Sequence, residues 1–291
     1  MDSALSRTTC GGKWRQRRMK LQYLGTAAYE GIPALFCECE VCRAARRMGG
    51  RDLRTRSQAL LDDKLLFDFP ADTLCHFQRY GIGWQNIRWC IITHSHSDHL
   101  YPQDIGAAGK GYCGSLIRPI KFFSARAGFE EIEKVLNRPG MEGRAKLEEV
   151  FPGKEFFAGE YRILPLRANH DSVSSPVVYA VESREKRMLY AHDTGVFPEE
   201  TWEMLGRFGK FDLVSLDCTG GFQKGWTEGH LCLDTARNVF GRLAYQGLLH
   251  ADTVRVVNHF SHNGGALYDA LSREAEKDKI VVAYDGLEIC F

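Results

Sequence analysis

The chain has 291 residues, of which 44% are hydrophobic and 26% charged, and its formal net charge is +1. This length allows one large domain with a substantial buried core. The near-neutral charge excludes a strong overall attraction to nucleic acid or to an anionic membrane. The apolar runs are too short to span a bilayer.

Residues 1–19 are predicted to form a basic N-terminal extension. They contain several arginines but no apolar segment, so they do not resemble a secretory signal. The expected location of the protein is therefore the cytoplasm. Met19 lies directly before the first strand-like run, which makes it an alternative to Met1 as the native start of translation.

Strands are predicted where short runs are rich in valine, isoleucine, leucine, tyrosine and phenylalanine. In chain order these runs cover residues 21–24, 65–68, 90–93, 120–123, 161–166, 177–182, 188–190, 213–217, 254–258 and 280–284. Apolar residues at helical spacing predict helices. The helices cover residues 129–136, 199–205, 233–243 and 265–275. Residues 20–291 contain no repeat or linker and are predicted to form one layered α/β domain with its site at one sheet edge.

The most informative segment follows the apolar run at residues 89–92. It reads Thr-His-Ser-His-Ser-Asp-His and places His94, His96, Asp98 and His99 within six positions. Imidazole and carboxylate groups are the usual ligands of divalent transition metals. Desolvating four such groups together is costly, and a bound metal is the simplest compensation. The segment therefore predicts a metal site at a strand end.

Three later residues of the same chemistry also follow strand-like runs: His170, Asp193 and His259. A single histidine in such a place is more often a hydrogen-bonded structural residue, but the recurrence at several strand ends favours a shared metal site. His192 precedes Asp193 on the predicted strand and would point to the opposite face, so it is interpreted as structural.

This pattern resembles the metallo-β-lactamase superfamily, and the resemblance extends from about Leu21 to the C-terminus. It implies a four-layer αββα sandwich and two divalent metal ions, either Mn or Zn, with Fe and Ni as alternatives. It implies hydrolysis by a hydroxide shared between the ions, because the set contains no nucleophilic serine or cysteine. The implied ligands are His94, His96 and His170 for one ion, Asp98, His99 and His259 for the other, and Asp193 as a bridge.

A second cluster places Cys37, Cys39 and Cys42 within a predicted loop at residues 37–42. The spacing is typical of a structural-zinc half-site that lacks its fourth ligand, and the alternative is three unrelated thiols. His262 is the best candidate for the fourth ligand. Since it lies three residues after His259, one short segment would serve both metal sites.

The cysteine cluster narrows the resemblance to the branch that holds the phosphoribosyl 1,2-cyclic phosphate phosphodiesterase of the carbon–phosphorus lyase pathway. His230 would then contact the substrate phosphate as a catalytic residue beside Asp98, although an ordinary helix-start histidine is an equal alternative. The segments shared with that branch are Leu24-Gly25-Thr26, Gly31-Ile32-Pro33, Asp217-Cys218-Thr219, Gly229-His230 and residues 284–289.

The leading hypothesis is a metal-dependent phosphodiesterase that acts on a small cyclic or diester phosphate. Alternatives on the same site are hydrolysis of a lactone, a thioester or a nucleic-acid phosphodiester, a redox or cofactor-biosynthesis relative, and a non-catalytic binding module. The expected partner is a small-molecule phosphate ester, with nucleic acid disfavoured, no membrane, and a homodimer allowed. The segments Gly106–Gly114 and Gly220–Gly229 are predicted to shape the substrate pocket.

Overall fold

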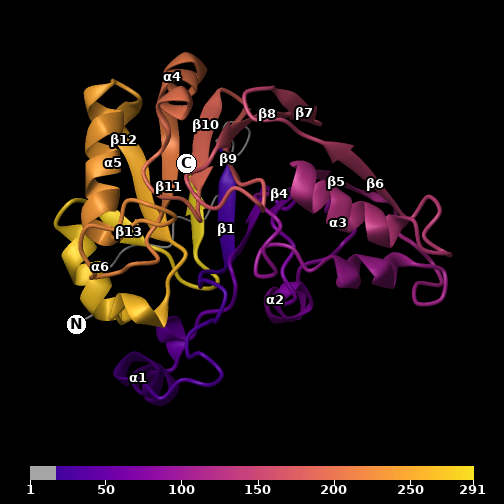
Figure 1. The fold of residues 1–291 in the computed structure, drawn as a ribbon, viewed down its shortest axis with the longest axis horizontal. Helices are drawn as coiled ribbons and strands as arrows, with labels where there is room; N and C mark the ends of the chain where they lie inside the picture. The colour runs from indigo at the N-terminus through magenta and orange to yellow at the C-terminus, as the bar shows by residue number, and fades with distance from the viewer. Residues whose placement is uncertain (1–17) are drawn as a thin grey trace.

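The computed structural model describes residues 18–291, which form two seven-stranded sheets packed face to face (Figure 1). The first sheet consists, in spatial order, of β14 (Glu288–Cys290), β1 (Lys20–Gly25), β2 (Gln58–Leu61), β3 (Leu65–Phe67), β4 (Trp89–Ile92), β5 (Ile120–Ser124) and β6 (Ala145–Glu149). The second consists of β13 (Ile280–Val282), β12 (Leu249–Asn258), β11 (Phe211–Asp217), β10 (Lys186–Ala191), β9 (Val177–Ser183), β8 (Tyr161–Arg167) and β7 (Phe156–Ala158).

Helices cover the outer face of each sheet. The first sheet is covered by α2 (Thr73–Tyr80), η3 (Pro102–Ala108) and α3 (Arg126–Leu136), and the second by α4 (Glu199–Phe208), α5 (Leu233–Tyr245) and α6 (Tyr268–Glu276). The remaining helical segments are α1 (Glu40–Met48), η2 (Gly50–Asp52) and η4 (His262–Gly264). The predicted four-layer αββα sandwich is confirmed.

The alternation of side chains along the strands builds two hydrophobic layers. In β4, Ile91 packs between the two sheets, whereas Cys90 and Ile92 pack under the outer helices. In β3, Phe67 likewise packs between the two sheets, and its neighbour Leu66 packs under the outer helices. Because both faces of these strands are buried, their sequences are continuously apolar and predict strands clearly.

The directions of the strands determine the edge of the sandwich at which the candidate site residues lie. The strands β3, β4, β5 and β6 run parallel to one another, and so do β10, β11, β12 and β13. The carboxyl ends of parallel neighbours lie at one edge of their sheet, and residues that follow these strands can therefore gather there.

Several elements were missed by the sequence prediction, and the predicted helix at residues 265–275 begins later, at Tyr268. The missed edge strand β6 has the sequence Ala-Lys-Leu-Glu-Glu, which carries the charges typical of an edge and hides the apolar alternation. The missed helix α1 carries three arginines, and its buried face consists of one cysteine and two alanines. The other missed elements are β2, β7, β14, α2 and the short helical segments η2, η3 and η4.

The domain boundary also differs from the predicted one. Met19 is fully buried, and its backbone N–H donates to Phe291 O at 3.1 Å. Met19 thus belongs to the folded domain and not to the predicted extension, of which residues 1–17 lie outside the described part. Within residues 18–291, no helix is both long enough and apolar enough to cross a membrane.

Candidate active site

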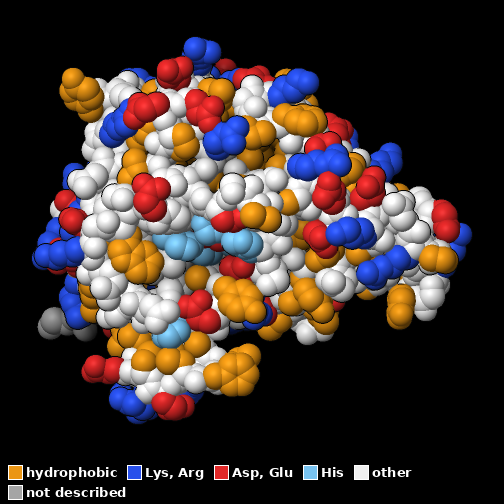
Figure 2. All heavy atoms as spheres, viewed as in Figure 1, with side chains coloured by type: hydrophobic (Ala, Val, Ile, Leu, Met, Phe, Trp, Pro, Cys, Tyr) orange, Lys and Arg blue, Asp and Glu red, His pale blue; other side chains and the backbone are white. Residues whose placement is uncertain are grey.

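Strand ends from both sheets meet at one edge of the sandwich and bring polar side chains together. β3 leads into Asp68, β4 into His94, β10 into Asp193 and β12 into His259, while β11 ends at Asp217. A cavity of about 330 Å³ opens there, which is within the size range of small-molecule sites. Figure 2 shows histidine side chains gathered in the middle of this face.

Three of the predicted metal-binding histidines form a first cluster with Asp193. His94 Nε2 lies 3.0 Å from His96 Nδ1, which lies 3.2 Å from His170 Nε2. His94 Nε2 also lies 3.1 Å from Asp193 Oδ2. Two ligands with bonds of about 2.1 Å to one ion are roughly 3.0–3.4 Å apart. The cluster therefore suits joint coordination of one divalent ion.

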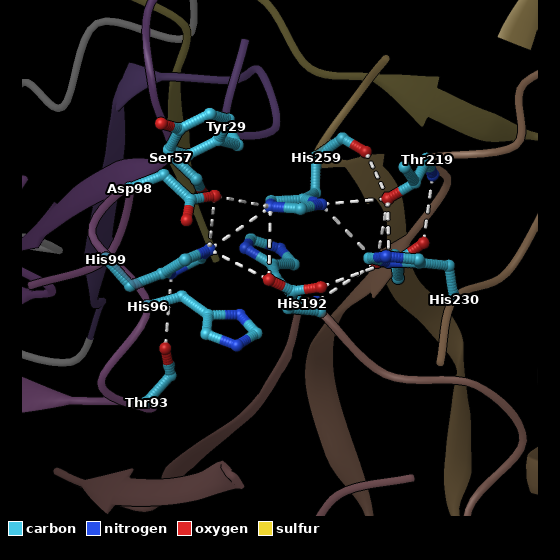
Figure 3. A network of polar contacts seen from close by, with 12 residues as sticks. Tyr29, Ser57, Thr93, His96, Asp98, His99, His192, Thr219, His230 and His259 are labelled. Carbon is cyan, nitrogen blue, oxygen red and sulfur yellow. Dashed lines mark hydrogen bonds and ion pairs between the residues drawn. The ribbon is translucent and has the colours of Figure 1, made fainter. Parts of the chain in front are cut away.

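The remaining predicted ligands form a second cluster with the same aspartate (Figure 3). His99 Nε2 lies 3.1 Å from His259 Nε2 and 3.4 Å from Asp98 Oδ2. Asp193 Oδ2 is 3.1 Å from both His94 Nε2 and His99 Nε2. One carboxylate oxygen thus contacts both clusters, which is the position required of a bridging ligand.

The protonation preferences of the site suit cations. Burial lowers the pKa of His94 to about 4, which leaves its ring nitrogen free to bind a metal. Burial alone would raise the pKa of Asp193, but His259, His230 and His94 hold it well below its usual range. Despite burial, the nearby carboxylates raise the pKa of His259 to about 9. The field at the site therefore favours positive charge.

Asp193 also has unused acceptor capacity. Its Oδ1 atom is buried and has no hydrogen-bond partner of suitable geometry among the described residues, although His230 Nδ1 lies 3.0 Å away. Buried acceptors in native proteins are almost always satisfied. A divalent cation would supply the missing partner, so the residues present fit a metal centre.

Each of the five histidines in the two clusters has a polar partner for its other ring nitrogen. These partners fix the tautomer and the orientation of a metal-binding imidazole. The pairs are His94 with Thr93 (3.1 Å), His96 with Asp171 (3.3 Å), His99 with Asp68 (2.7 Å), His170 with Gly229 O (3.1 Å) and His259 with Thr219 (2.8 Å).

His230 lies beside the two clusters and lines the cavity. Its Nδ1 is 3.0 Å from Asp193 Oδ1 and 3.2 Å from Asp217 Oδ2. Despite burial, Asp217 and Asp193 raise the pKa of His230 to about 11. Figure 3 shows His230 and Thr219 on one side of His259 and Asp98 on the other. His230 is thus placed as a charged hydrogen-bond donor at the cavity wall.

His192 lies outside both clusters. It is buried, its Nε2 is 2.7 Å from Ser215 Oγ, and its Nδ1 is 3.2 Å from Asn258 Nδ2. These contacts lie within the second sheet and are those of a structural histidine.

The backbone turns sharply at three of the strand ends. Asp68, Asp193 and His259 have φ values of 68°, 56° and 63°, in the left-handed region that non-glycine residues seldom adopt. Such strain persists only where surrounding contacts hold it, and it gathers at functional sites. Here the turn directs each side chain from its strand end into the site.

Sequence reasoning missed Asp68 and assigned no role to Asp217. Asp217 accepts hydrogen bonds from three backbone N–H groups, those of Asp193, Thr219 and Leu231. It therefore holds Asp193, the Thr219 that supports His259, and the segment that carries His230. Asp68 and Asp217 could have been found by the pattern that identified His94, because both are potential ligands at the end of a strand.

Replacing Asp68 with asparagine is expected to lower metal affinity by about 10- to 100-fold. The substitution keeps the shape but removes the charge that orients His99, and such partners have effects of this size. Competition titration of bound metal measures the loss. Asp63→Asn, at an exposed carboxylate paired with Lys20, is the matched control, and equal metal affinity in the two variants would contradict the assigned role.

The predicted fourth zinc ligand lies beside the cysteines. Cys39 Sγ is 3.4 Å and Cys37 Sγ is 3.7 Å from His262 Nδ1, and Cys42 belongs to the same cluster. A sulfur and a nitrogen on one tetrahedral zinc are about 3.5 Å apart. Burial alone would raise the pKa of Cys39, but the Cys42 N–H and the neighbouring side chains lower it to about 6. The thiolate is the form that binds zinc.

The predicted loop at residues 37–42 is only partly a loop. Cys39 is the N-cap of α1, and its Sγ accepts the Cys42 N–H at 3.4 Å. Cys42 lies in the first turn of that helix. The helix was missed because residues 37–42 were interpreted as a loop, although Val41, Ala44, Ala45 and Met48 follow the spacing of an amphipathic helix.

Of the two segments predicted to shape the substrate pocket, one lines the cavity at the clusters and the other does not. Trp226, in Gly220–Gly229, lines the cavity at the clusters. Residues of Gly106–Gly114 instead line a separate apolar cavity of about 420 Å³ beside Phe77 and Trp84. No residue of Gly106–Gly114 lines the cavity at the histidine and aspartate clusters.

A two-sheet sandwich with histidine and aspartate clusters at one edge defines a metallo-β-lactamase-fold hydrolase. Residues 71–249 match the family described as "Beta-lactamase superfamily domain", and the chain belongs to this family. A comparison with curated proteins found no match.

Solved structures agree with this fold. A diphosphatase from the PhnP family is 21% identical over 94% of this chain and 97% of its own, with a TM-score of 0.70. Zinc-bound PqqB from Methylobacterium extorquens is 18% identical over 93% and 99%, with a TM-score of 0.70. The short form of human tRNase Z is 16% identical over 93% and 98%, with a TM-score of 0.62.

Proposed function

We propose that this protein is a metal-dependent phosphodiesterase that hydrolyses a small cyclic or diester phosphate. The observation that carries the proposal is the shared Asp193 carboxylate, which contacts both ligand clusters and His230. Other proteins of this fold, including the PhnP-family diphosphatase, tRNase Z and yeast PDE1, support phosphoryl chemistry.

The two clusters would hold two divalent ions, and the cysteine cluster with His262 would hold one structural zinc. When bound, the two ions would lower the pKa of water and offset negative charge on the phosphoryl oxygens. Manganese and zinc both suit the donors, with iron and nickel as alternatives. Asp98 would serve as a ligand within the second cluster.

His230 has a role that depends on this chain's own geometry. Its Nδ1 faces Asp193 and Asp217, and the ring lines the cavity. The other ring nitrogen can therefore donate a hydrogen bond to a phosphoryl oxygen or a proton to the leaving oxygen. The paired carboxylates keep the imidazole charged and hold its orientation.

The proposal predicts metal-dependent hydrolysis of bis(p-nitrophenyl) phosphate. Activity should disappear after chelation and return with added Mn²⁺ or Zn²⁺, because the ligand clusters need their cations. Release of p-nitrophenolate measures the rate. Activity that survives chelation, or that persists unchanged in His96→Ala protein, would contradict the proposal. Faster hydrolysis of a lactone or a thioester would favour the alternative use of the site.

A further inference from the structure

We propose that the substrate of this site carries a single phosphoryl group, joined to an uncharged portion with hydroxyl or amino donors, and that Glu30 determines this selectivity. The inference rests on the proposed phosphodiesterase function and names the substrate class of that same site.

The first observation is the charge of the cavity wall. Among the described residues, no lysine or arginine lines the cavity, whereas the Glu30 carboxylate does. Figure 2 shows acidic and hydrophobic side chains directly around the histidine patch. Proteins that bind a second phosphate ordinarily supply lysine, arginine or a helix N-terminus for it. Because the charge of His230 is assigned to the reacting phosphoryl group, the rest of the wall offers a second phosphate no side-chain cation, and Glu30 would repel it.

Glu30 has the hydrogen-bonding capacity of a specificity residue. Its Oε1 accepts the Ser261 hydroxyl at 2.5 Å and lies 3.7 Å from His262 Nε2. The side chain is 27% exposed. A carboxylate can accept several hydrogen bonds, so Glu30 can also accept from a substrate hydroxyl or amino group. A substrate carboxylate or phosphate offers no such donor.

The backbone holds Glu30 firmly at the cavity. Ala28 N–H donates to Phe260 O at 2.9 Å, and Phe260 N–H donates to Thr26 O at 2.8 Å. These bonds join the segment after β1 to the segment that carries His259. The carboxylate therefore has a fixed position relative to the metal ligands, as a specificity residue requires.

Aromatic side chains bound the cavity on two sides. Tyr29 is 60% exposed and lies on the Asp98 side of the site in Figure 3. Trp226 lies on the other side, with its ring centroid 6.3 Å from that of His230. Exposed aromatic faces suit an uncharged ring or sugar face. Together with Glu30 they suit a neutral, hydroxyl-bearing portion.

Two cations near these wall residues do not line the cavity. Arg56 lies under the Tyr29 ring, donates to Tyr29 O at 2.8 Å and pairs with Asp72 at 3.4 Å. Lys224, on the same segment as Trp226, is exposed and does not line the cavity. Neither side chain therefore forms part of the wall.

The test compares two ligands that differ by one phosphate, adenosine 3′-monophosphate and adenosine 3′,5′-bisphosphate. Calorimetric titration of the metal-loaded protein is expected to show at least about tenfold tighter binding of the monophosphate, because the second phosphate meets Glu30. In kinetics, adenosine 2′,3′-cyclic phosphate should exceed its 5′-phosphorylated form in kcat/KM by a similar factor.

Charge reversal provides the decisive variant. Glu30→Lys should shift the ratio of the two affinities at least about tenfold toward the bisphosphate, and Glu30→Gln should shift it partway. Glu203→Lys, an exposed position on α4, makes the same change in net charge and should leave the ratio unaltered. Zinc content is measured in each variant because Glu30 lies near His262, and Glu30→Gln is used if Glu30→Lys loses zinc.

Equal or tighter binding of the bisphosphate by the unaltered protein would overturn the inference, and so would an unchanged ratio in both Glu30 variants. Either result could occur while bis(p-nitrophenyl) phosphate is still hydrolysed in a metal-dependent manner. The failure of this inference is therefore distinguishable from a failure of the proposed function.

Discussion

Asp193→Asn protein is expected to lose hydrolysis almost completely, with kcat/KM on bis(p-nitrophenyl) phosphate falling by at least about 1000-fold. Asp193 Oδ2 lies 3.1 Å from both His94 and His99, and its Oδ1 lies 3.0 Å from His230. One neutral amide would therefore weaken both ligand clusters and remove a charge that holds His230.

Metal analysis of the Asp193→Asn protein shows whether the loss of activity comes from loss of bound metal. Loss of bound catalytic metal together with activity is expected, because the carboxylate serves both clusters. Asp212→Asn is the matched control, since Asp212 is a half-buried carboxylate at the opposite end of β11 and pairs with Lys186 at 2.6 Å. Retention of most activity in Asp193→Asn protein would show that the shared aspartate is not part of the reaction centre.

Cys39→Ser protein is expected to lose one zinc per chain and to be less stable by several kcal/mol, because a structural metal contributes folding free energy directly. The melting temperature should fall by roughly 5–10 °C. Serine can still cap α1, so the capping contact that Cys39 makes to Cys42 N–H is largely kept. The loss of stability would therefore result from the missing zinc and not from a weakened helix cap.

Elemental analysis and calorimetry measure the two effects. Hydrolysis per folded molecule should fall much less than stability, since the catalytic clusters use none of the cysteines. Cys75→Ser is the control, because Cys75 is exposed on α2 and outside the cluster. Unchanged zinc content and melting temperature in Cys39→Ser protein would rule out the structural zinc.

The fold was predictable because strands buried on both faces have continuous apolar sequences. β4 and β10 were predicted within one or two residues of their bounds. The edge strand β6 was not, since an edge needs charge and can lose its apolar pattern. Helix α1 was missed because its cysteines were interpreted as part of a loop, and because its buried face consists only of the small residues Cys42, Ala44 and Ala45.

The candidate ligands could be collected from the sequence because each one follows a strand. The residues that support them could not be assigned in the same way. Asp68 and Asp217 are acids at strand ends like the others, and only the distances show that Asp68 faces His99 and Asp217 faces His230. Glu30 carries no local pattern at all, since its place depends on the pairing of two distant segments.

The sequence by itself determined the donor types, their positions after strands and the spacing of the cysteines, because these are local properties of the chain. Only the tertiary structure decided which donors share a cluster, which carboxylate contacts both clusters and which side chains form the cavity wall. The reason is that strand order and direction bring residues more than 150 positions apart, such as His99 and His259, to within 3.1 Å. No local pattern contains that information.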